Sequence, residues 1–203
     1  DELGATIEVL HDFGVLPTPG ERDDKIGEAD VVWTSGGSSQ LARERFAKSG
    51  TDAALIDAAP GRVLAGGSAG TMMLSRNGMS YLTDDGNPRY VPVEGAVPLA
   101  DITVSPHLDY VEPENGNTEP RGTYFRDFAE DYVGAQDTAA RIGIDHEAAL
   151  ALADGQFKVV ANQHGSGVTS LKRDSSGGII EQRFMPTDQG VYLPQSMLVQ
   201  APK

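Results

Sequence analysis

Short apolar runs in the first half of the chain alternate with glycine-rich turns and helical segments. The runs 31–34 and 62–65 are predicted to be strands, and each is followed by a turn that contains two adjacent glycines. The segments 40–48 and 69–74 come next and are predicted to be helices. This alternation is typical of an α/β fold with parallel central strands. Since such sheets carry their sites at the carboxyl ends of the strands, both glycine turns are expected at the same edge of one sheet.

The second half of the chain is predicted to be richer in strands. Further strands are expected at 6–10, 102–105, 141–152, 157–161, 167–171 and 178–184, helices at 52–59 and 124–133, a turn at 84–88 and a loop at 112–121. Short polar turns such as 153–155 predict an antiparallel C-terminal portion. No repeat or low-complexity linker divides the sequence, so a single domain over residues 1–203 is expected. Because the chain enters a β-prone run at once, we also expect that an N-terminal strand–helix segment is missing.

Composition narrows the classes of function. The 203 residues are 39% hydrophobic and 23% charged, as in an ordinary globular protein, and their formal net charge is −14. This negative charge disfavours nucleic acid and anionic membranes as partners. The sequence contains no cysteine, which excludes disulfides, zinc sites with Cys ligands and a Cys nucleophile. No apolar run of about 18 residues and no signal peptide stand out, so a cytoplasmic protein is expected.

A serine between glycines is the first candidate for chemistry. Ser68 lies in the pentapeptide 66–70 (Gly-Gly-Ser-Ala-Gly), between a predicted strand and a predicted helix. This Gly-x-Ser-x-Gly pattern is the nucleophile elbow, in which the glycines permit a sharp turn that exposes the serine hydroxyl. The amide of Ala69 would then be the first oxyanion donor. The alternative is a structural turn whose serine only caps a helix. No Lys follows at the spacing of a phosphate-binding loop.

A serine nucleophile needs a base, and four histidines are available: His11, His107, His146 and His164. His107 follows the predicted strand 102–105 and a proline, which places it at a strand end. His11 ends the first predicted strand. His146 lies inside the predicted strand 141–152, and His164 lies in a polar hairpin. His107 is therefore the favoured base.

The remaining members of the site are less sharply defined by the residues alone. The acidic group that orients the base could be Asp84, Asp85, Glu94 or Asp101, since all four lie between the serine and the histidine. The turn that contains Gly36 and Gly37 could supply the second oxyanion amide, because glycines let a backbone N–H approach a reacting carbonyl closely. Its alternative is an ordinary tight turn between a strand and a helix.

Four stretches resemble one family, the dipeptidase E and cyanophycinase family of serine peptidases. They are 31–41 (with Thr-Ser-Gly-Gly and a later Gln-Leu), 66–70, 104–107 (Val-Ser-Pro-His) and 143–150 (Gly-Ile-Asp-His-Glu-Ala-Ala-Leu). They occur in the order that the family shows and together span about residues 31 to 152. One such match would be weak, whereas four in order are specific.

The resemblance implies a three-layer α/β fold of the class I glutamine-amidotransferase type, with a mostly parallel sheet and helices on both faces. It implies a triad in which Ser68 is the nucleophile and His107 the base. The family's acidic member lies shortly after the elbow helix, where Asp85 is preferred and Asp84 is the alternative. Gly37 and Ala69 would supply the oxyanion amides, with Gly36 as the alternative to Gly37. No cofactor or metal is implied, and a homodimer is a candidate assembly.

The family's members cleave small peptides after an N-terminal aspartate or at β-aspartyl links. A substrate carboxylate needs a cation, and Arg121 in the loop beyond the histidine is the candidate, with a plain surface arginine as its alternative. Where family members carry Asn or Asp-Gln after the first glycines, this chain has Ser38 and Ser39, so Ser38 is a second candidate for substrate binding. Either serine can also cap the next helix. An aspartyl dipeptidase is therefore predicted, and a cyanophycinase-like hydrolase, a non-catalytic binding module and an α/β-hydrolase esterase are the rivals.

Overall fold

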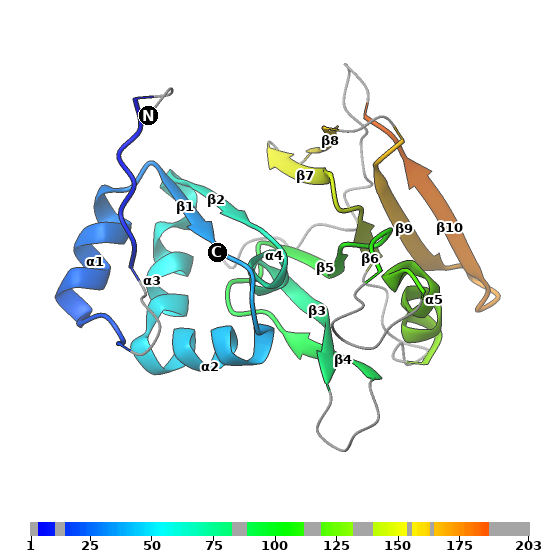
Figure 1. The fold of residues 1–203 in the computed structure, drawn as a ribbon, viewed down its shortest axis with the longest axis horizontal. Helices are drawn as coiled ribbons and strands as arrows, with labels where there is room; N and C mark the ends of the chain where they lie inside the picture. The colour runs from blue at the N-terminus through cyan, green and yellow to red at the C-terminus, as the bar shows by residue number, and fades with distance from the viewer. Residues whose placement is uncertain are drawn as a thin grey trace.

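The computed structural model describes residues 4–10, 15–82, 89–111, 119–131, 140–153, 156–162 and 165–186 (Figure 1). Its helices are α1 (Pro19–Glu28), α2 (Ser39–Ser49), α3 (Thr51–Ala58), α4 (Ala69–Met73) and α5 (Arg121–Asp131), with one turn of 3₁₀-helix at Ala59–Gly61. Its strands are β1 (Val31–Thr34), β2 (Val63–Gly66), β3 (Ser75–Leu82), β4 (Arg89–Glu94), β5 (Ala100–Pro106), β6 (Ala140–Ile144), β7 (Ala148–Ala153), β8 (Gln156–Ala161), β9 (Val168–Arg173) and β10 (Ile179–Phe184).

The described strands form three sheets. Strands β1 and β2 make a parallel pair, and β7 and β8 make an antiparallel pair. The largest sheet has the order β10-β9-β6-β5-β3-β4, with parallel pairing of β6, β5 and β3 at its centre and antiparallel pairing toward both edges. The predicted α/β fold with parallel central strands and an antiparallel C-terminal portion is confirmed. The parallel strands are divided between two sheets, and both glycine turns follow the carboxyl ends of the β1–β2 pair, at the same edge of one sheet as predicted.

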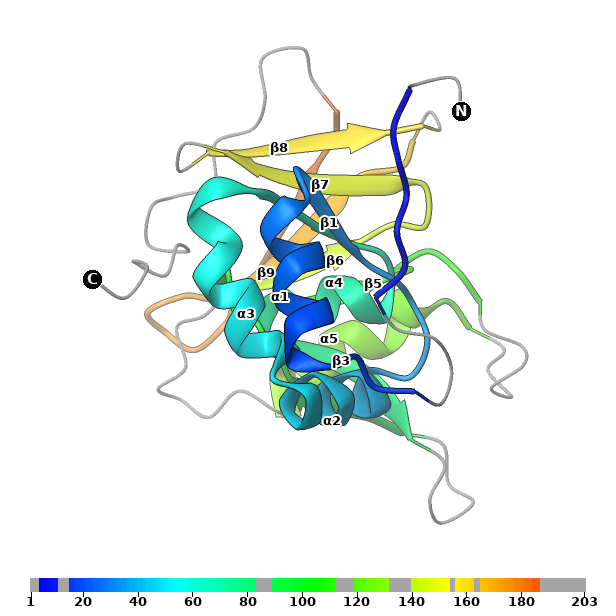
Figure 2. The same ribbon diagram turned by 90° about the vertical axis from the view of Figure 1, so that its left-hand side faces the viewer.

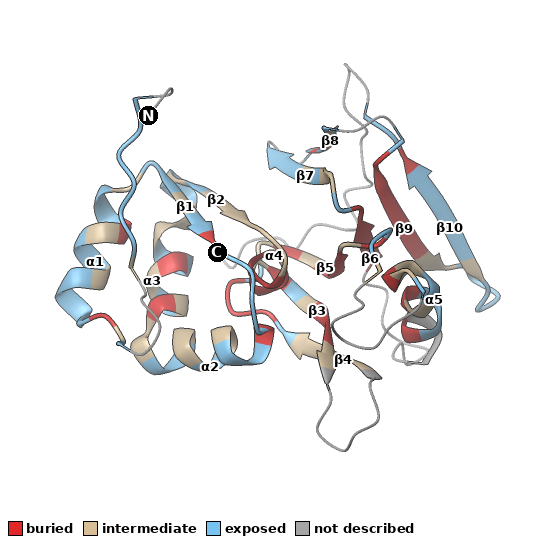
Figure 3. Ribbon diagram, in the orientation of Figure 1, coloured by how far each residue is buried: buried red, intermediate tan, exposed pale blue. Residues whose placement is uncertain are grey.

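Helix α4 lies between these two groups of parallel strands and contacts β1, β2, β3 and β5 (Figure 1). It is short but deeply buried, since Met72 and Met73 are 4% and 0% exposed. The Met72 side chain fills the space above Gly78 of β3, where an added Cβ would come within 2.4 Å of it. Figure 3 shows the same concentration of buried residues at α4 and along β5, β6 and β9. The elbow helix is thus a central packing element, which fixes the position of the turn that precedes it.

Helices α1, α2 and α3 gather on the outer side of the β1–β2 pair (Figure 2). Their apolar side chains form one cluster with α4 that includes Ile26 and Leu55. Helix α1 was not predicted from the sequence. Its start nevertheless carries a local signal, because Thr18 caps it by accepting from the Glu21 N–H at 3.2 Å and Pro19 occupies the first turn.

Several predicted boundaries need correction. Residues 6–10 form no strand, and this run instead lies along α1, where the Val9 carbonyl accepts from the Lys25 ammonium at 2.9 Å. The predicted strand 141–152 is two strands, β6 and β7, with a turn between them. The predictions for 84–88, 112–118 and 154–155 lie outside the described residues. Within the described ranges, every helix is too short or too polar to cross a membrane.

Candidate active site

Ser68 adopts the backbone conformation of a nucleophile elbow. It lies between β2 and α4, separated from the end of β2 by one residue, with φ +54° and ψ −121°. L-residues rarely adopt such angles, and the strain costs on the order of 1–3 kcal/mol, which only a strongly constraining environment maintains. Outside glycine, only Ser68 and His107 have a positive φ in the part of the chain that the structure describes. These are the two residues that the sequence predicted to be the nucleophile and the base.

The glycines on either side of Ser68 are required by packing. An added Cβ at Gly66 would come within 2.6 Å of the Gly70 backbone, and one at Gly70 would come within 2.0 Å of the Thr34 carbonyl oxygen. Hydrogen bonds tie the same turn together, because the Thr34 hydroxyl donates to the Gly70 carbonyl at 3.0 Å. The Thr71 hydroxyl donates to the Gly66 carbonyl at 2.6 Å. The predicted strand–turn–helix elbow is therefore the observed local structure.

The first glycine turn lies directly against the elbow. Strands β1 and β2 are parallel and Thr34 pairs with Gly66, so their carboxyl ends leave the sheet side by side. An added Cβ on Gly36 would be 3.0 Å from the Ser68 Cβ and 3.4 Å from its Oγ. Gly37 has φ +130° and open space around it. Ala69 begins α4, and the N–H groups of a first helical turn have no acceptor within the helix.

His107 lies at the end of β5, on the other side of α4. Met72 of α4 packs on Gly78, and Gly78 pairs with Val104 near the end of β5. Ser68 and His107 thus come from separate sheets, at strand ends that α4 connects. The His107 ring contacts His146 in the turn after β6 and lies near Tyr110, whose ring centroid is 6.3 Å away.

His146 is the group that sequence reasoning did not select. Its Nδ1 is 3.0 Å from the Nδ1 of His107, and its ring stacks on Tyr110 with centroids 5.1 Å apart and planes 22° apart. Its backbone N–H donates to the Asp109 carboxylate at 2.6 Å. The Glu147 carboxylate lies 3.8 Å from its Nε2. Strands β5 and β6 are parallel and Pro106 pairs with Ile144, which brings the two histidine turns together.

Of the four acidic candidates, the structure describes Glu94 and Asp101. Asp84 and Asp85 lie outside the described residues. Glu94 lies 3.8 Å from the Arg43 guanidinium, and Asp101 accepts a hydrogen bond from Arg76 at 2.8 Å. Both are engaged on the surface by arginines. His11 and His164 also lie outside the described part of the chain.

The two candidate substrate-binding residues have defined places. Arg121 begins α5 and is only 6% exposed, so its alternative as a surface arginine is wrong. Its guanidinium carbon lies 5.3 Å from the centre of the Tyr90 ring, and its backbone N–H donates to the Tyr110 carbonyl at 3.2 Å. Ser38 is the N-cap of α2 and accepts from the Leu41 N–H at 3.3 Å, which confirms the predicted cap.

A cavity of about 320 Å³ opens beside the His107 turn. Its lining includes Leu108, Asp109, Gly122, Asp145, Glu181 and Arg183. Asp145 is 3% exposed and accepts from the Gly167 N–H at 2.8 Å and from both terminal nitrogens of Arg183. The hydrogen bond to Asp145 raises the pKa of Arg183 above its ordinary value. This pair fixes the turn after β6, and therefore the place of His146.

Comparisons with known proteins identify the family of the chain. Residues 1–160 match the sequence profile of peptidase family S51. The crystal structure of a peptidase from an acI-B1 Actinobacterium has a TM-score of 0.59 at 20% sequence identity. The match covers 87% of this chain and 64% of that peptidase. A proposed peptidase E from Listeria monocytogenes EGD-e, solved at 1.5 Å, has a TM-score of 0.47 at 17% identity, over 84% of this chain and 67% of that chain. No curated protein sequence matches significantly. The chain thus spans less than two thirds of the Actinobacterium peptidase.

Proposed function

Because the chain belongs to peptidase family S51, we propose that it acts as a serine peptidase of the peptidase E type, with Ser68 as nucleophile and His107 as general base. One observation carries this proposal. Ser68 and His107 are the residues other than glycine that hold a positive φ among those that the structure describes. Strained backbone of this kind clusters at active sites, where it positions reacting side chains.

The proposed reaction is acyl transfer in two steps. His107 Nε2 takes the Ser68 hydroxyl proton while Oγ bonds to the substrate carbonyl carbon, and the oxyanion that forms is bound by the Ala69 N–H and by an N–H of the Gly36–Gly37 turn. The tetrahedral intermediate collapses as His107 gives the proton to the leaving amine. Water then attacks the acyl-enzyme, and His107 removes its proton and returns one to Ser68 Oγ. Asp85, or Asp84, remains the predicted acidic member.

The proposed substrate is a small peptide with an N-terminal aspartate. Arg121 is the cation offered for the substrate carboxylate, and its position at the start of α5, hydrogen-bonded to Tyr110, supports this role. Ser38 directly follows the Gly36–Gly37 turn and is the second residue proposed to contact the substrate. It is exposed, and its hydroxyl oxygen keeps a free lone pair while it caps α2.

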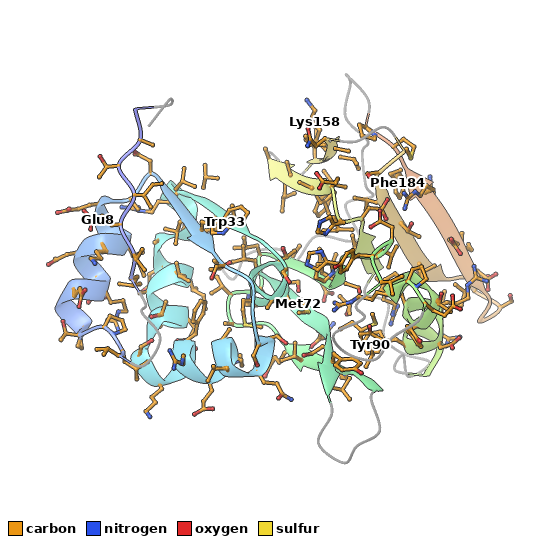
Figure 4. The ribbon with its side chains drawn as sticks, in the orientation of Figure 1. Glu8, Trp33, Met72, Tyr90, Lys158 and Phe184 are labelled. Carbon is orange, nitrogen blue, oxygen red and sulfur yellow. The ribbon has the colours of Figure 1, made fainter. Side chains whose placement is uncertain are left out.

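The second candidate function is hydrolysis of β-aspartyl-arginine links, and one feature favours it. Trp33 is 64% exposed, and its ring lies so close to Gly67, the residue before the nucleophile, that an added Cβ there would come within 2.8 Å of it (Figure 4). An exposed indole face attracts an arginine guanidinium, and the net charge of −14 would steer such a cation toward the protein.

A panel of Asp-X dipeptides, X-Asp dipeptides and β-Asp-Arg tests these functions. Hydrolysis of Asp-X substrates alone supports the aspartyl dipeptidase, and hydrolysis of β-Asp-Arg alone supports the second candidate. Ser68→Ala should lower kcat by more than about 10⁴-fold and leave the fold intact. Exposed Ser175, in the turn between β9 and β10, provides the matched control variant Ser175→Ala.

Labelling with a fluorophosphonate separates catalysis from a non-catalytic binding module. The wild-type protein and Ser175→Ala should be labelled, and Ser68→Ala should not. Equal labelling of Ser68→Ala, or unchanged activity of that variant, would refute the proposed function.

A further inference from the structure

We propose that His146 is the positioning residue that orients the base His107, in the place that a carboxylate holds in a Ser-His-Asp triad. The proposal rests on the proposed function, because it presupposes that His107 takes the Ser68 proton. It differs from the sequence-based prediction for Asp84 and Asp85 and makes that prediction testable.

The hydrogen bond between the two rings fixes which nitrogen carries each proton. The Nδ1 atoms of His107 and His146 are 3.0 Å apart, so one must donate and the other must accept. A general base must keep Nε2 unprotonated toward the serine, which leaves the proton of His107 on Nδ1. His107 therefore donates to His146 Nδ1, and His146 carries its own proton on Nε2. The Glu147 carboxylate, 3.8 Å from that Nε2, favours this tautomer.

The surroundings hold the His146 ring in place for this role. Tyr110 stacks on one face of the ring, and Asp109 accepts from the His146 backbone N–H. Both residues belong to the same turn as His107. The adjacent Asp145 is buried and bound by Arg183 and the Gly167 N–H, so the turn is anchored on its other side as well. Contacts of the His146 ring, of its backbone N–H and of the adjacent Asp145 thus hold the His146 side chain in one orientation.

The arrangement also helps the reaction. When His107 becomes an imidazolium, its Nδ1–H keeps an acceptor in the neutral His146 ring. Among the described residues, charged and titratable groups near the pair include Asp109 and Tyr110 in the turn after β5, Asp145 and Glu147 in the turn after β6, Arg183 on β10 and Arg121 at the start of α5. One N–H offers one short linear hydrogen bond, so a carboxylate of residue 84 or 85 and His146 compete for the same position on His107.

The kinetic test compares His146→Ala, His146→Gln, Asp84→Asn, Asp85→Asn and His107→Ala with the wild type. His146→Ala should lower kcat by about 100-fold and change KM by less than about threefold, as expected for a group that acts in the transition state. His146→Gln should recover part of kcat, since an amide oxygen can accept from Nδ1–H. Asp84→Asn and Asp85→Asn measure what the predicted acidic members contribute: if either lowers kcat as much as His146→Ala does, a carboxylate orients the base and the role of His146 is refuted.

The pH profile gives a readout that a structural role would not move. Below the range in which both imidazoles titrate, log kcat/KM of the wild type should fall with a slope approaching two, because protonation of either ring removes the required hydrogen-bonded pair. The slope should approach one in His146→Gln. An unchanged slope in this variant would overturn the proposal.

A proton NMR spectrum tests the hydrogen bond independently of activity. The shared Nδ1 proton should give a low-field signal that persists in Asp84→Asn and Asp85→Asn and vanishes in His146→Ala and His107→Ala. If His146→Ala keeps this signal or wild-type kcat while His107→Ala is inactive, the role of His146 is refuted and the proposed function stands. If His107→Ala is also fully active, the proposed function itself fails.

Discussion

Gly36 faces Ser68 so closely that a methyl group on Gly36 would come within 3.0 Å of the Ser68 Cβ. The contact brings the turn after β1 against the turn after β2. Because Gly36 has no side chain, only backbone atoms of this turn lie beside the serine hydroxyl. In an acyl transfer this is the space that the developing oxyanion needs. Gly36 is therefore constrained by the geometry of the nucleophile and not only by its own turn.

Gly36→Ala should reduce catalysis while the protein remains folded. The added methyl group must displace Ser68 or the turn by several tenths of an ångström, and misplacement of a reacting group by about 1 Å costs up to about 100-fold in rate. We expect kcat/KM to fall by about 10-fold to 100-fold and fluorophosphonate labelling to slow in parallel.

Gly61→Ala is the matched control, because an added Cβ at Gly61 meets no atom within 4 Å and its φ is not positive. It should retain wild-type kcat/KM. Equal activity of Gly36→Ala and Gly61→Ala would mean that the turn after β1 does not confine the nucleophile.

Gly70→Ala should destabilise the fold. Its Cβ would lie 2.0 Å from the Thr34 carbonyl oxygen, which is backbone of the adjacent strand and cannot move aside without opening the β1–β2 pair. Overpacking of this kind costs about 1–3 kcal/mol or more in the free energy of unfolding. At about 2–4 °C per kcal/mol, thermal unfolding followed by circular dichroism should show a clear drop in Tm, whereas Gly61→Ala should not. An unchanged Tm would show that the elbow is packed less tightly than the structure indicates.

The elbow could be predicted from the sequence because its signals are local. Glycines at 66 and 70 and a short apolar run suffice to predict a strand, a sharp turn and a helix, and the parallel pairing of β1 with β2 then brings Gly36 to Ser68. Strands β3 and β4 were missed for the opposite reason. The sequence 75–82 mixes Ser, Arg, Asn and Gly with apolar residues, and its strand conformation depends on hydrogen bonds to β4 and β5, which no local pattern of residues specifies.

His146 was not selected from the sequence because the end of β6 and the start of β7 were not predicted. The apolar residues on both sides of 145–147 suggested a continuous strand, which would place His146 in its interior. The polar triplet Asp-His-Glu is the signal that could have shown the break, since charged residues rarely interrupt a buried strand. The contact with His107 depends on the parallel register of β5 and β6, which no local pattern specifies.

Acid should weaken the turn between β9 and β10 through Asp174. The carboxylate of Asp174 accepts from the Ser176 hydroxyl, the Gly178 N–H and the Ser176 N–H, and these hydrogen bonds lower its pKa below the ordinary 3.8. A carboxyl whose pKa is lowered by folding stabilises the native state above its unfolded pKa, and this contribution is lost as the pH falls through the folded pKa. Wild-type Tm should therefore exceed that of Asp174→Asn at neutral pH, and the difference should shrink as the pH falls below 3.8. A difference that stays constant over this range would argue against the ionised carboxylate as its source.

Trp33→Ala should change the choice of substrate more than the rate of the chemistry. Trp33 is exposed, contacts Gly67 beside the nucleophile, and can stack on a cationic side chain, whereas it donates nothing to the reacting atoms. We expect kcat/KM for β-Asp-Arg to fall about fivefold or more and that for Asp-Leu to change by less than about twofold, since a cation–π contact at a partly exposed site contributes about 1 kcal/mol. Trp33→Phe should be intermediate.

Val31→Ala is the matched control, because Val31 is exposed on the same face of β1, two residues from Trp33. Equal losses on both substrates would indicate that Trp33 supports the elbow, and the second candidate function would then lose the feature that favours it.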